Sequence, residues 1–399
     1  MPARLRIPAF FPATRQTALD RLDVFLPEAG RRYQEMRNHD LGPGDRSNVS
    51  ALSPFVRHRL ITEAELVRRV HAVHDASAAY KFTSEVFWRT YFKGYLETRP
   101  SIWLRYQQAV RQQTDALKGG RAKAYEAAVE GRTGIDCFDA WNEELVTIGY
   151  VHNHARMWYA SIWMHTLGLP WTLGADHFYR HLLCGDPASN TLSWRWVAGL
   201  HTKGKAYKAT ASNIARYTDG RFAPGDALKG SAVPMEDDWN GQPGPVPAGE
   251  RAPDGPVFLL LHEDDLHPES LAALEGLDVV GLAAFQATDS RSPRGAGEMA
   301  AAFTAEALAD GLARAGEAFG AEGSVVSPDA LGDLVTESGA AAVVTPYAPV
   351  GPAADVLGGL DLPVPIHRLL RPEDAAAWPY CTKGFFALRK QIPGLMTAY

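Results

Sequence analysis

The stretch that decides the fold opens with Glu130-Gly-Arg-Thr-Gly134 and closes with Trp194-Arg-Trp196. It lies within residues 16–222, where apolar residues recur at three- and four-residue spacing between short loops bearing Gly, Pro, Asn or Asp. That spacing is typical of amphipathic helices, and Thr62 stands three residues before Glu65, the capping-box spacing of a helix start. We therefore expect residues 1–222 to form an all-helical domain.

Large aromatic residues are concentrated in this region. Eight of the ten tryptophans precede residue 223. They fit an all-α domain with a wide, aromatic-lined interior, although tryptophans also serve simply as core.

The helical pattern stops at a segment rich in proline and glycine, residues 223–256, which reads as a linker. Beyond it, apolar runs rich in β-formers alternate with helical segments such as 297–318. The expected strands are residues 257–261, 279–284, 324–326, 341–345 and 364–367. The alternation predicts a parallel α/β, Rossmann-like domain over residues 257–399, with a helical segment at its C-terminal end. No phosphate-binding glycine motif occurs in it.

Charge divides the chain in two. Residues 1–222 carry 30 Lys and Arg against 21 Asp and Glu, whereas residues 223–399 carry 10 against 25. Only the first part has the electrostatic footprint expected for binding a polyanion, although a merely solvated basic surface is the alternative.

The remaining composition narrows the class of protein. No run approaches the roughly 18 apolar residues of a membrane span, and the start lacks a signal-peptide pattern, so we expect a cytoplasmic protein without membrane contact. Cys137, Cys184 and Cys381 are far apart, which excludes a disulfide framework or a four-thiolate metal site. We expect no metal site.

Several motifs occur in a fixed order between residues 130 and 196. They are Glu130-Gly-Arg-Thr-Gly134, Asp139-Ala140, Gly149-Tyr-Val-His-Asn-His-Ala-Arg-Met157, Gly185-Asp186, Asn190 and Trp194-Arg-Trp196. In order and spacing they resemble the centre of the photolyase/cryptochrome family. Upstream, Tyr33-x-x-x-Arg37, Val49-Ser-Ala-Leu-Ser53 and Ser84-Glu-Val-Phe-Trp-Arg-Thr-Tyr-Phe92 resemble further family elements. The resemblance covers about 190 residues and implies a helical FAD-binding domain.

The resemblance also implies the residues that hold FAD. These are Tyr33, Ser50, Ala51, Leu52, Ser53, Phe82, Arg89, Asn153, Arg156, Cys184, Gly185, Asp186 and Asn190. Ser50 and Ser53 offer hydroxyl donors in a loop leading into a helix, a reasonable phosphate cradle, although an ordinary helix cap before Pro54 is the alternative. Asn190 corresponds to the position beside flavin N5, where photolyases carry Asn, and this favours repair over signalling.

Cys184 departs from the family, which usually has Asp there. The change removes a carboxylate partner of Arg156. It leaves that arginine either to pair with Asp186 or to act directly on a reduced, anionic flavin.

For the substrate, the resemblance places Arg37, Glu85, Trp88, His154, Met157 and Trp196 at the DNA lesion. Tryptophan faces can stack on an extruded pair of linked pyrimidines, and a carboxyl group can bond to their edge. Asn153 and Met157 stand where (6-4) photolyases place histidines, so cyclobutane dimers are preferred. Alternatively, Trp88, Met157 and Trp196 are core residues at helical spacing.

The expected phosphate contacts are altered. His154 and Thr210 replace expected phosphate-binding arginines, and the candidate substitutes are Lys203, Lys205, Lys208, Arg216 and Arg221.

The family's electron-transfer tryptophans align with Trp194 and Trp171, which we group with Asn190 and Glu85 as catalytic residues. The third member of the chain is open among Trp103, Tyr106, Trp158 and Trp163. The sequence thus predicts light-driven, FAD-dependent repair of pyrimidine dimers in DNA, a lyase activity. The alternative is a cryptochrome-like blue-light photoreceptor with a signalling partner.

The second domain stands in an unusual place, because photolyases ordinarily begin with their α/β domain. Residues 257–271 resemble the family's opening strand and loop, which implies a rearranged order with an antenna-type domain at the C-terminus. An unidentified antenna chromophore is therefore a candidate second cofactor. An unrelated α/β module is the alternative.

Overall fold

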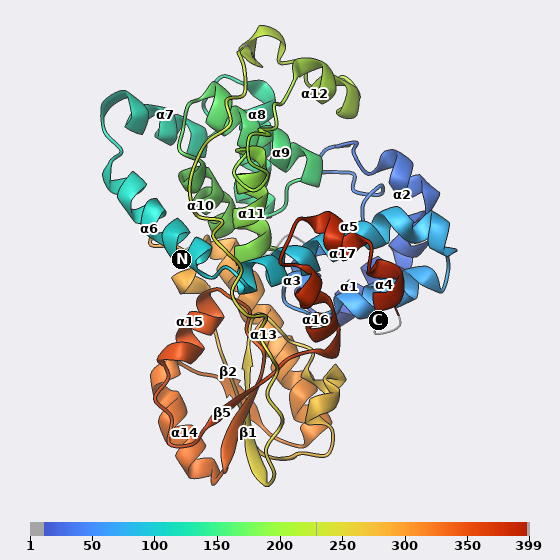
Figure 1. The fold of residues 1–399 in the computed structure, drawn as a ribbon, viewed down its shortest axis with the longest axis vertical. Coiled ribbons are helices and arrows are strands. Elements are labelled where there is room, and N and C mark those ends of the chain that lie inside the picture. The colour runs from blue at the N-terminus through green and yellow to red at the C-terminus, as the bar shows by residue number, and fades with distance from the viewer. Residues whose placement is uncertain (1–11, 229, 397–399) are drawn as a thin grey trace, which may run out of the picture.

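The computed structural model describes residues 12–228 and 230–396, and Figure 1 shows a helical part above a sheet with flanking helices. The helices of the first part are α1 (Arg15–Phe25), α2 (Arg31–Met36), α3 (Ser53–Arg57), α4 (Glu63–His71), α5 (Ala76–Glu97), α6 (Ser101–Asp115), α7 (Gly119–Val129), α8 (Asp136–Ile148), α9 (Asn153–Ser161), α10 (Trp171–His181), α11 (Pro187–Val197) and α12 (Ala211–Tyr217). A π-helical turn, Ile162–Thr166, extends α9. The expected helix start at Thr62 is present, since its side chain accepts a hydrogen bond from the Glu65 amide at 3.1 Å.

The second part is built on five parallel strands in the order β3-β2-β1-β4-β5. The strands are β1 (Pro256–His262), β2 (Asp278–Phe285), β3 (Gly323–Val325), β4 (Ala342–Pro346) and β5 (Ile366–Leu369). The helices between them are α13 (Glu298–Phe319), α14 (Leu331–Ser338) and α15 (Pro352–Gly359). The predicted fold class is confirmed: a helical part precedes a parallel α/β part.

The sheet joins the helical part through one of its faces. Val257, Leu259 and Leu261 of β1 belong to the core cluster that also holds the helical part, whereas Phe258 and Leu260 belong to a separate cluster with α14 and α15. Successive side chains of a strand point to opposite faces, so both faces of β1 are covered. One hydrophobic core therefore runs from the helices into the sheet.

After β5 the chain returns to the helical part. Helices α16 (Pro372–Ala377), α17 (Phe385–Arg389) and α18 (Ile392–Leu395) follow, and α16 and α17 contact α5. Gly94 permits the approach, because a Cβ there would lie 2.7 Å from the Trp378 ring and 2.9 Å from Cys381 Sγ. No helix among the described residues has the length and apolar character needed to cross a membrane.

Buried ion pairs connect the two parts. Arg59, between α3 and α4, pairs with Glu63 beside it and with Asp265 and Asp374 from the second part. Arg371 pairs with the same Asp265 at 2.6 Å. The acidic second half thus supplies carboxylates to buried arginines, an electrostatically complementary contact.

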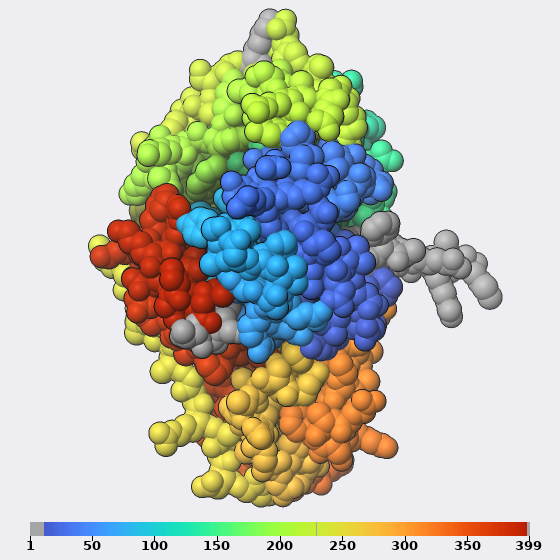
Figure 2. Space-filling view, turned by 90° about the vertical axis from the view of Figure 1, so that its right-hand side faces the viewer, coloured from blue at the N-terminus to red at the C-terminus, as the bar shows by residue number. Residues whose placement is uncertain are grey.

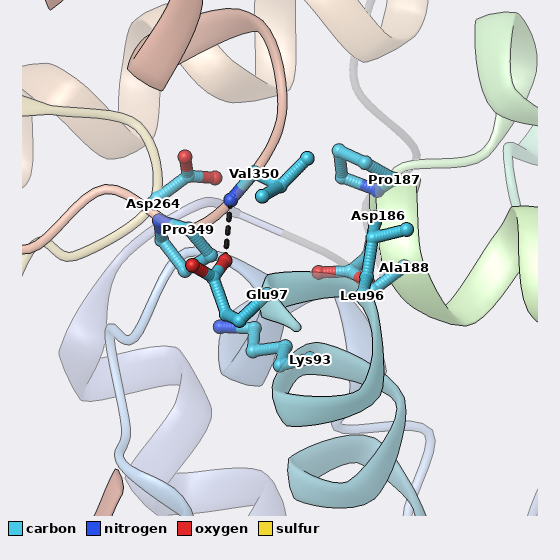
Figure 3. A pocket seen from close by; sticks show the side chains of 9 residues that line it. All are labelled: Lys93, Leu96, Glu97, Asp186, Pro187, Ala188, Asp264, Pro349 and Val350. Atoms are coloured by element: carbon cyan, nitrogen blue, oxygen red, sulfur yellow. Dashed lines mark hydrogen bonds between the residues drawn. The ribbon is translucent and has the colours of Figure 1, made fainter. Parts of the chain in front are cut away.

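Strand order reverses between β1 and β4, the position at which open α/β sheets commonly bind ligands. Here the end of α5 occupies it (Figure 3): Glu97 accepts hydrogen bonds from the Val350 amide at 2.6 Å and the Tyr347 hydroxyl at 2.8 Å. The remaining cavity, lined also by Lys93 and Asp186, measures about 10 Å³. That is room for about one water, so this crevice is too small for an antenna chromophore.

Candidate functional site

One large cavity lies among α2, the loop before α3, α5, α9 and α11, with a volume of about 450 Å³. Pockets for organic ligands commonly measure about 300–1,000 Å³. The structure brings together here the predicted residues Tyr33, Ser50, Ala51, Leu52, Ser53, Phe82, Glu85, Trp88, Arg89, Asn153, Arg156, Met157, Cys184, Asn190, Trp194 and Trp196. The other predicted residues, Arg37, His154, Trp171, Gly185 and Asp186, do not line it.

The loop before α3 forms one wall in a strained conformation. Ala51 has φ 49°, in the left-handed region that costs a non-glycine residue about 1 kcal/mol. The turn directs Ser50 Oγ back to the Leu52 amide at 3.4 Å, a long contact. On the adjacent wall, Tyr33 meets Phe82 edge-on with ring centroids 5.2 Å apart, and burial raises the pKa of its hydroxyl. Tyr33 therefore serves here as a neutral aromatic wall.

Helix α11 carries a polar pair into the cavity. Asn190 Nδ2 donates to the Ala175 carbonyl at 2.8 Å, which fixes the orientation of its amide. Beside it, Ser189 lines the cavity, and its Oγ is buried without a hydrogen-bond partner among the described residues. A buried hydroxyl without a partner costs free energy, so Ser189 Oγ is a free polar group for a ligand at this wall.

Arg156 and Asp186 have separate partners. Arg156 Nη2 lies 3.1 Å from Cys184 Sγ, and its Nε donates to the Val151 carbonyl. Asp186 caps α11 through the Ser189 amide at 2.7 Å and lies 3.5 Å from Arg89. Burial opposes ionisation of Asp186, but the nearby cations outweigh it and hold its pKa well below the usual value. Of the two alternatives for Arg156, pairing with Asp186 is not what the structure shows.

The predicted lesion residues of α5 are held by neighbours outside the cavity. The Glu85 carboxylate lies 2.8 Å from Lys81 and 3.1 Å from Arg37. Arg37 does not line the cavity itself, but it forms an ion pair with Glu85, which does. Trp88 stacks on Phe385 of α17, with centroids 3.8 Å apart and planes inclined by 13°. Both α5 side chains are thereby positioned before any ligand binds.

Aromatic rings continue from the cavity into the core. Trp194 meets Trp163 with centroids 6.3 Å apart, and Trp163 meets Tyr125 at 5.9 Å. Trp171 instead contacts Tyr106 at 5.9 Å and Trp239 at 5.6 Å. Among the open candidates for a further member, Trp163 is the one in ring contact with Trp194.

Comparison with known proteins agrees with this geometry. The family model described as FAD binding domain of DNA photolyase matches residues 82–219, which supply most of the cavity wall. Over residues 82–219, the helical part of the chain resembles the photolyase/cryptochrome family. The match implies FAD as the cofactor, and the α/β part follows the matching region, which is consistent with a rearranged domain order.

Relatives within the family resemble only part of this chain. A deoxyribodipyrimidine photo-lyase from Streptomyces griseus is 35% identical over 165 residues, covering 41% of this chain and 34% of the relative. One from Neurospora crassa is 28% identical over 210 residues, covering 51% and 34%. A class III photolyase structure from Agrobacterium tumefaciens has 25% identity and a TM-score of 0.43, covering 51% of this chain and 42% of that one. The chain thus spans about a third of the length of these curated relatives.

His154 and Thr210, which stand where phosphate-binding arginines were expected, have structural roles of their own. The His154 ring stacks on Trp158 at 4.2 Å, and burial lowers its pKa. Thr210 caps α12 by accepting from the Asn213 amide. Among the candidate substitutes, Arg221 pairs with buried Asp40 at 2.7 Å, whereas Lys203, Lys205 and Arg216 are exposed. These three are therefore more accessible to a phosphate than Arg221.

Sequence reasoning missed several residues of the photolyase-like cavity. Ser189 and Ser193 of α11 line it together with Asn190, Trp194 and Val197. Spacings of three and four along a helix put such residues on one face, and this signal was available in the sequence. Phe92 and Tyr150 also line the cavity, but their inward orientation depends on packing between helices.

Proposed function

We propose that this chain binds FAD in the 450 Å³ cavity and uses light to repair cyclobutane pyrimidine dimers in DNA. The observation that carries the proposal is the sharing of one cavity by two sets of residues. Asn190 and Arg156 belong to the set assigned to the flavin, and Glu85, Trp88 and Trp196 to the set assigned to the lesion. Electron exchange requires the two partners to lie close together, and one cavity achieves that. The names of the curated relatives support the same reaction.

The donor groups of the cavity suit a flavin. When bound, FAD would supply light absorption and a single electron for the dimer. Asn190 presents a neutral amide whose orientation is fixed, and Ser189 Oγ offers a buried hydroxyl that has no partner in the part of the chain that the structure describes. Arg156 lies against a thiol rather than a carboxylate, so its positive charge is not neutralised by that neighbour. These residues orient the cofactor and favour negative charge on it.

The dimer would enter as an extruded nucleotide pair. Trp88 and Trp196 offer aromatic faces, and Glu85 offers a carboxyl group for the edge of the pyrimidines. Trp88 is held by Phe385, and Trp196 stacks on Tyr207 with centroids 5.8 Å apart. No proton transfer from the protein is required for the bond cleavage, so these residues act by binding and by excluding water.

A second candidate function is blue-light reception. The contacts of Trp194 with Trp163 and of Trp163 with Tyr125 favour it, because they form an aromatic route by which the cofactor could be reduced in light. A photoreceptor needs that route and a signalling partner, whereas repair needs an extruded dimer in the cavity.

Illumination of the reduced, flavin-loaded protein with dimer-containing DNA tests the proposal. We expect restored thymines in blue or near-ultraviolet light and none in the dark. Glu85→Gln should lower the yield, while the exposed control Glu143→Gln should not. Flavin-loaded protein that photoreduces yet restores no thymines would overturn the repair proposal in favour of the photoreceptor.

A further inference from the structure

The end of the chain, residues 378–396, packs along α5 and is here named the C-terminal segment. Cys381, Phe385, Leu388, Ile392 and Leu395 are buried and hold it in place. Figure 2 shows the segment, in red, at the surface beside the light-blue residues of the helical part. It lies outside residues 82–219, the range that matches the family.

The inner side of the segment reaches a residue of the cavity. Phe385 stacks on Trp88 with centroids 3.8 Å apart and also contacts Tyr91 at 5.7 Å. Trp88 lines the cavity and Phe385 does not, so Phe385 supports the indole from outside it. The segment is therefore a direct neighbour of the site assigned to the lesion.

The outer side of the segment is basic and aromatic. Lys383, Phe386, Arg389 and Lys390 are exposed, and the Phe386 side chain is 69% exposed. The Arg389 guanidinium lies over the rings of Phe386 and Tyr80, at 5.7 and 5.4 Å from their centroids. This contact aligns α17 with the start of α5.

The charge of the segment is opposite to that of the half of the chain to which it belongs. Residues 375–399 contain Lys383, Arg389 and Lys390 and no Asp or Glu, although residues 223–399 hold 25 acidic residues. A basic strip with an exposed aromatic ring is complementary to nucleic acid, whose phosphates attract cations and whose bases stack on aromatic faces.

We propose that the C-terminal segment forms part of the nucleic-acid-binding face, with Lys383, Arg389 and Lys390 at backbone phosphates and Phe386 against an unstacked base beside the lesion. The inference rests on the proposed function, since it places DNA at the cavity that Trp88 lines. It adds a binding surface from the acidic half, where net charge alone argued against one.

The first test compares two triple variants of the full chain that lose equal charge. Lys383→Gln with Arg389→Gln and Lys390→Gln removes the basic strip. Arg111→Gln with Arg121→Gln and Lys123→Gln removes three exposed charges from α6 and α7, which lie on the opposite side of the molecule from α17 (Figure 1). Duplex binding is measured over a range of salt concentrations, because each phosphate contact contributes about 0.9 to the slope of log affinity against log salt. We expect the strip variant to lower that slope by about 2 to 3 and the control to leave it near the wild-type value.

The second test concerns the aromatic contact. Phe386→Ala should weaken binding of dimer-containing DNA about 5- to 30-fold, whereas Leu104→Ala, which removes another exposed apolar side chain, should not. Flavin content should stay unchanged in all four variants, because none of the substituted residues lines the cavity.

The outcomes separate this inference from the proposed function. Equal slopes for both triple variants, in a protein that repairs dimers, would overturn the inference and leave the function intact. A wild-type protein that repairs no dimers but shows the expected loss of slope would support the surface and overturn the function. Association of the segment with a second copy of the chain or an acidic protein, without DNA binding, would overturn both.

Discussion

The indole of Trp194 meets that of Trp163 almost at right angles, with centroids 6.3 Å apart and planes inclined by 88°. Gly174 on α10 makes the approach possible. A Cβ at this position would lie 2.4 Å from the Trp194 ring and 2.9 Å from the Trp163 ring. The aromatic contact between the cavity and the core therefore depends on the absence of a side chain at Gly174.

Substitutions should show which of two aromatic routes carries electrons to the flavin. One route runs from Trp194 to Trp163 and Tyr125, and the other runs from Trp171 to Tyr106 and Trp239. Trp194→Phe should slow photoreduction of the flavin strongly while flavin stays bound, since Trp194 lines the cavity and its ring contacts Trp163 deeper in the core. Trp163→Phe should slow it more than Trp171→Phe. Transient absorption after a laser flash measures the rates. A larger effect of Trp171→Phe would assign the route to Tyr106 and Trp239 instead.

Gly174→Ala should disturb the same contact without removing an aromatic ring. The added methyl group has no room beside Trp194, and overpacking of this kind costs about 1–3 kcal/mol of unfolding free energy. Chemical denaturation measures the loss. As a control, a Cβ at Gly332 in α14 would lie more than 4 Å from every atom of residues 12–228 and 230–396 outside its chain neighbours and the adjacent helix backbone, so Gly332→Ala should be close to neutral or stabilising. Equal stabilities of the two variants would contradict the tight contact.

Removal of Asp265 should destabilise the junction between the helical and the α/β parts. Its carboxylate pairs with Arg371 and Arg59, all three being buried, so Asp265→Ala leaves uncompensated charge and should cost about 3–5 kcal/mol. Asp23→Ala, which breaks the exposed pair with Arg69, should cost less than about 1 kcal/mol. Urea unfolding compares them. Similar losses would show that the buried pair contributes no more than a surface pair.

Glu97 should make stability depend on pH in a defined window. Burial raises the pKa of its carboxyl to about 7, against the lowering effect of the Val350 amide and the Tyr347 hydroxyl, and its ordinary value is 4.5. Between these values the unfolded chain has released a proton that the folded chain still holds. Stability therefore falls as pH rises from about 4.5 to about 7.

The variant Glu97→Gln cannot release this proton and provides the comparison. The stability of the wild type relative to the variant should fall by about 3 kcal/mol across the window. Unfolding in urea at a series of pH values measures the difference, with exposed Glu126→Gln as control. Parallel profiles of wild type and Glu97→Gln would contradict the raised pKa.

Cys184→Asp should lower the reduction potential of a bound flavin. Arg156 now contacts the Cys184 sulfur at 3.1 Å, and a carboxylate in its place would neutralise the positive charge that favours a reduced, anionic cofactor. Spectroelectrochemical titration measures the potential, and Cys184→Ser controls for loss of the thiol. A potential that is the same in both variants would show that Arg156 does not act on the flavin.

Local patterns in the sequence were sufficient to predict the helices and strands and much of the cavity lining. Helix periodicity, the cap at Thr62 and the alternation after residue 256 depend on neighbours within a few positions, so the helices and the parallel sheet could be predicted. Asn190 and Trp194 lie four residues apart on α11 and reach the same cavity for the same reason.

Contacts between distant segments were decided only by the tertiary structure. The stacking of Phe385 on Trp88 and the hydrogen bond of the Val350 amide to Glu97 join residues more than 250 positions apart, and no spacing rule predicts such pairs. The contact of Trp163 with Trp194 was likewise not predictable from spacing, because the pattern marks Trp163 only as a helical core residue. The two rings meet because Gly174 of α10 leaves room between them. Periodicity determines which face of a helix is buried, whereas close packing of whole elements determines what that face meets.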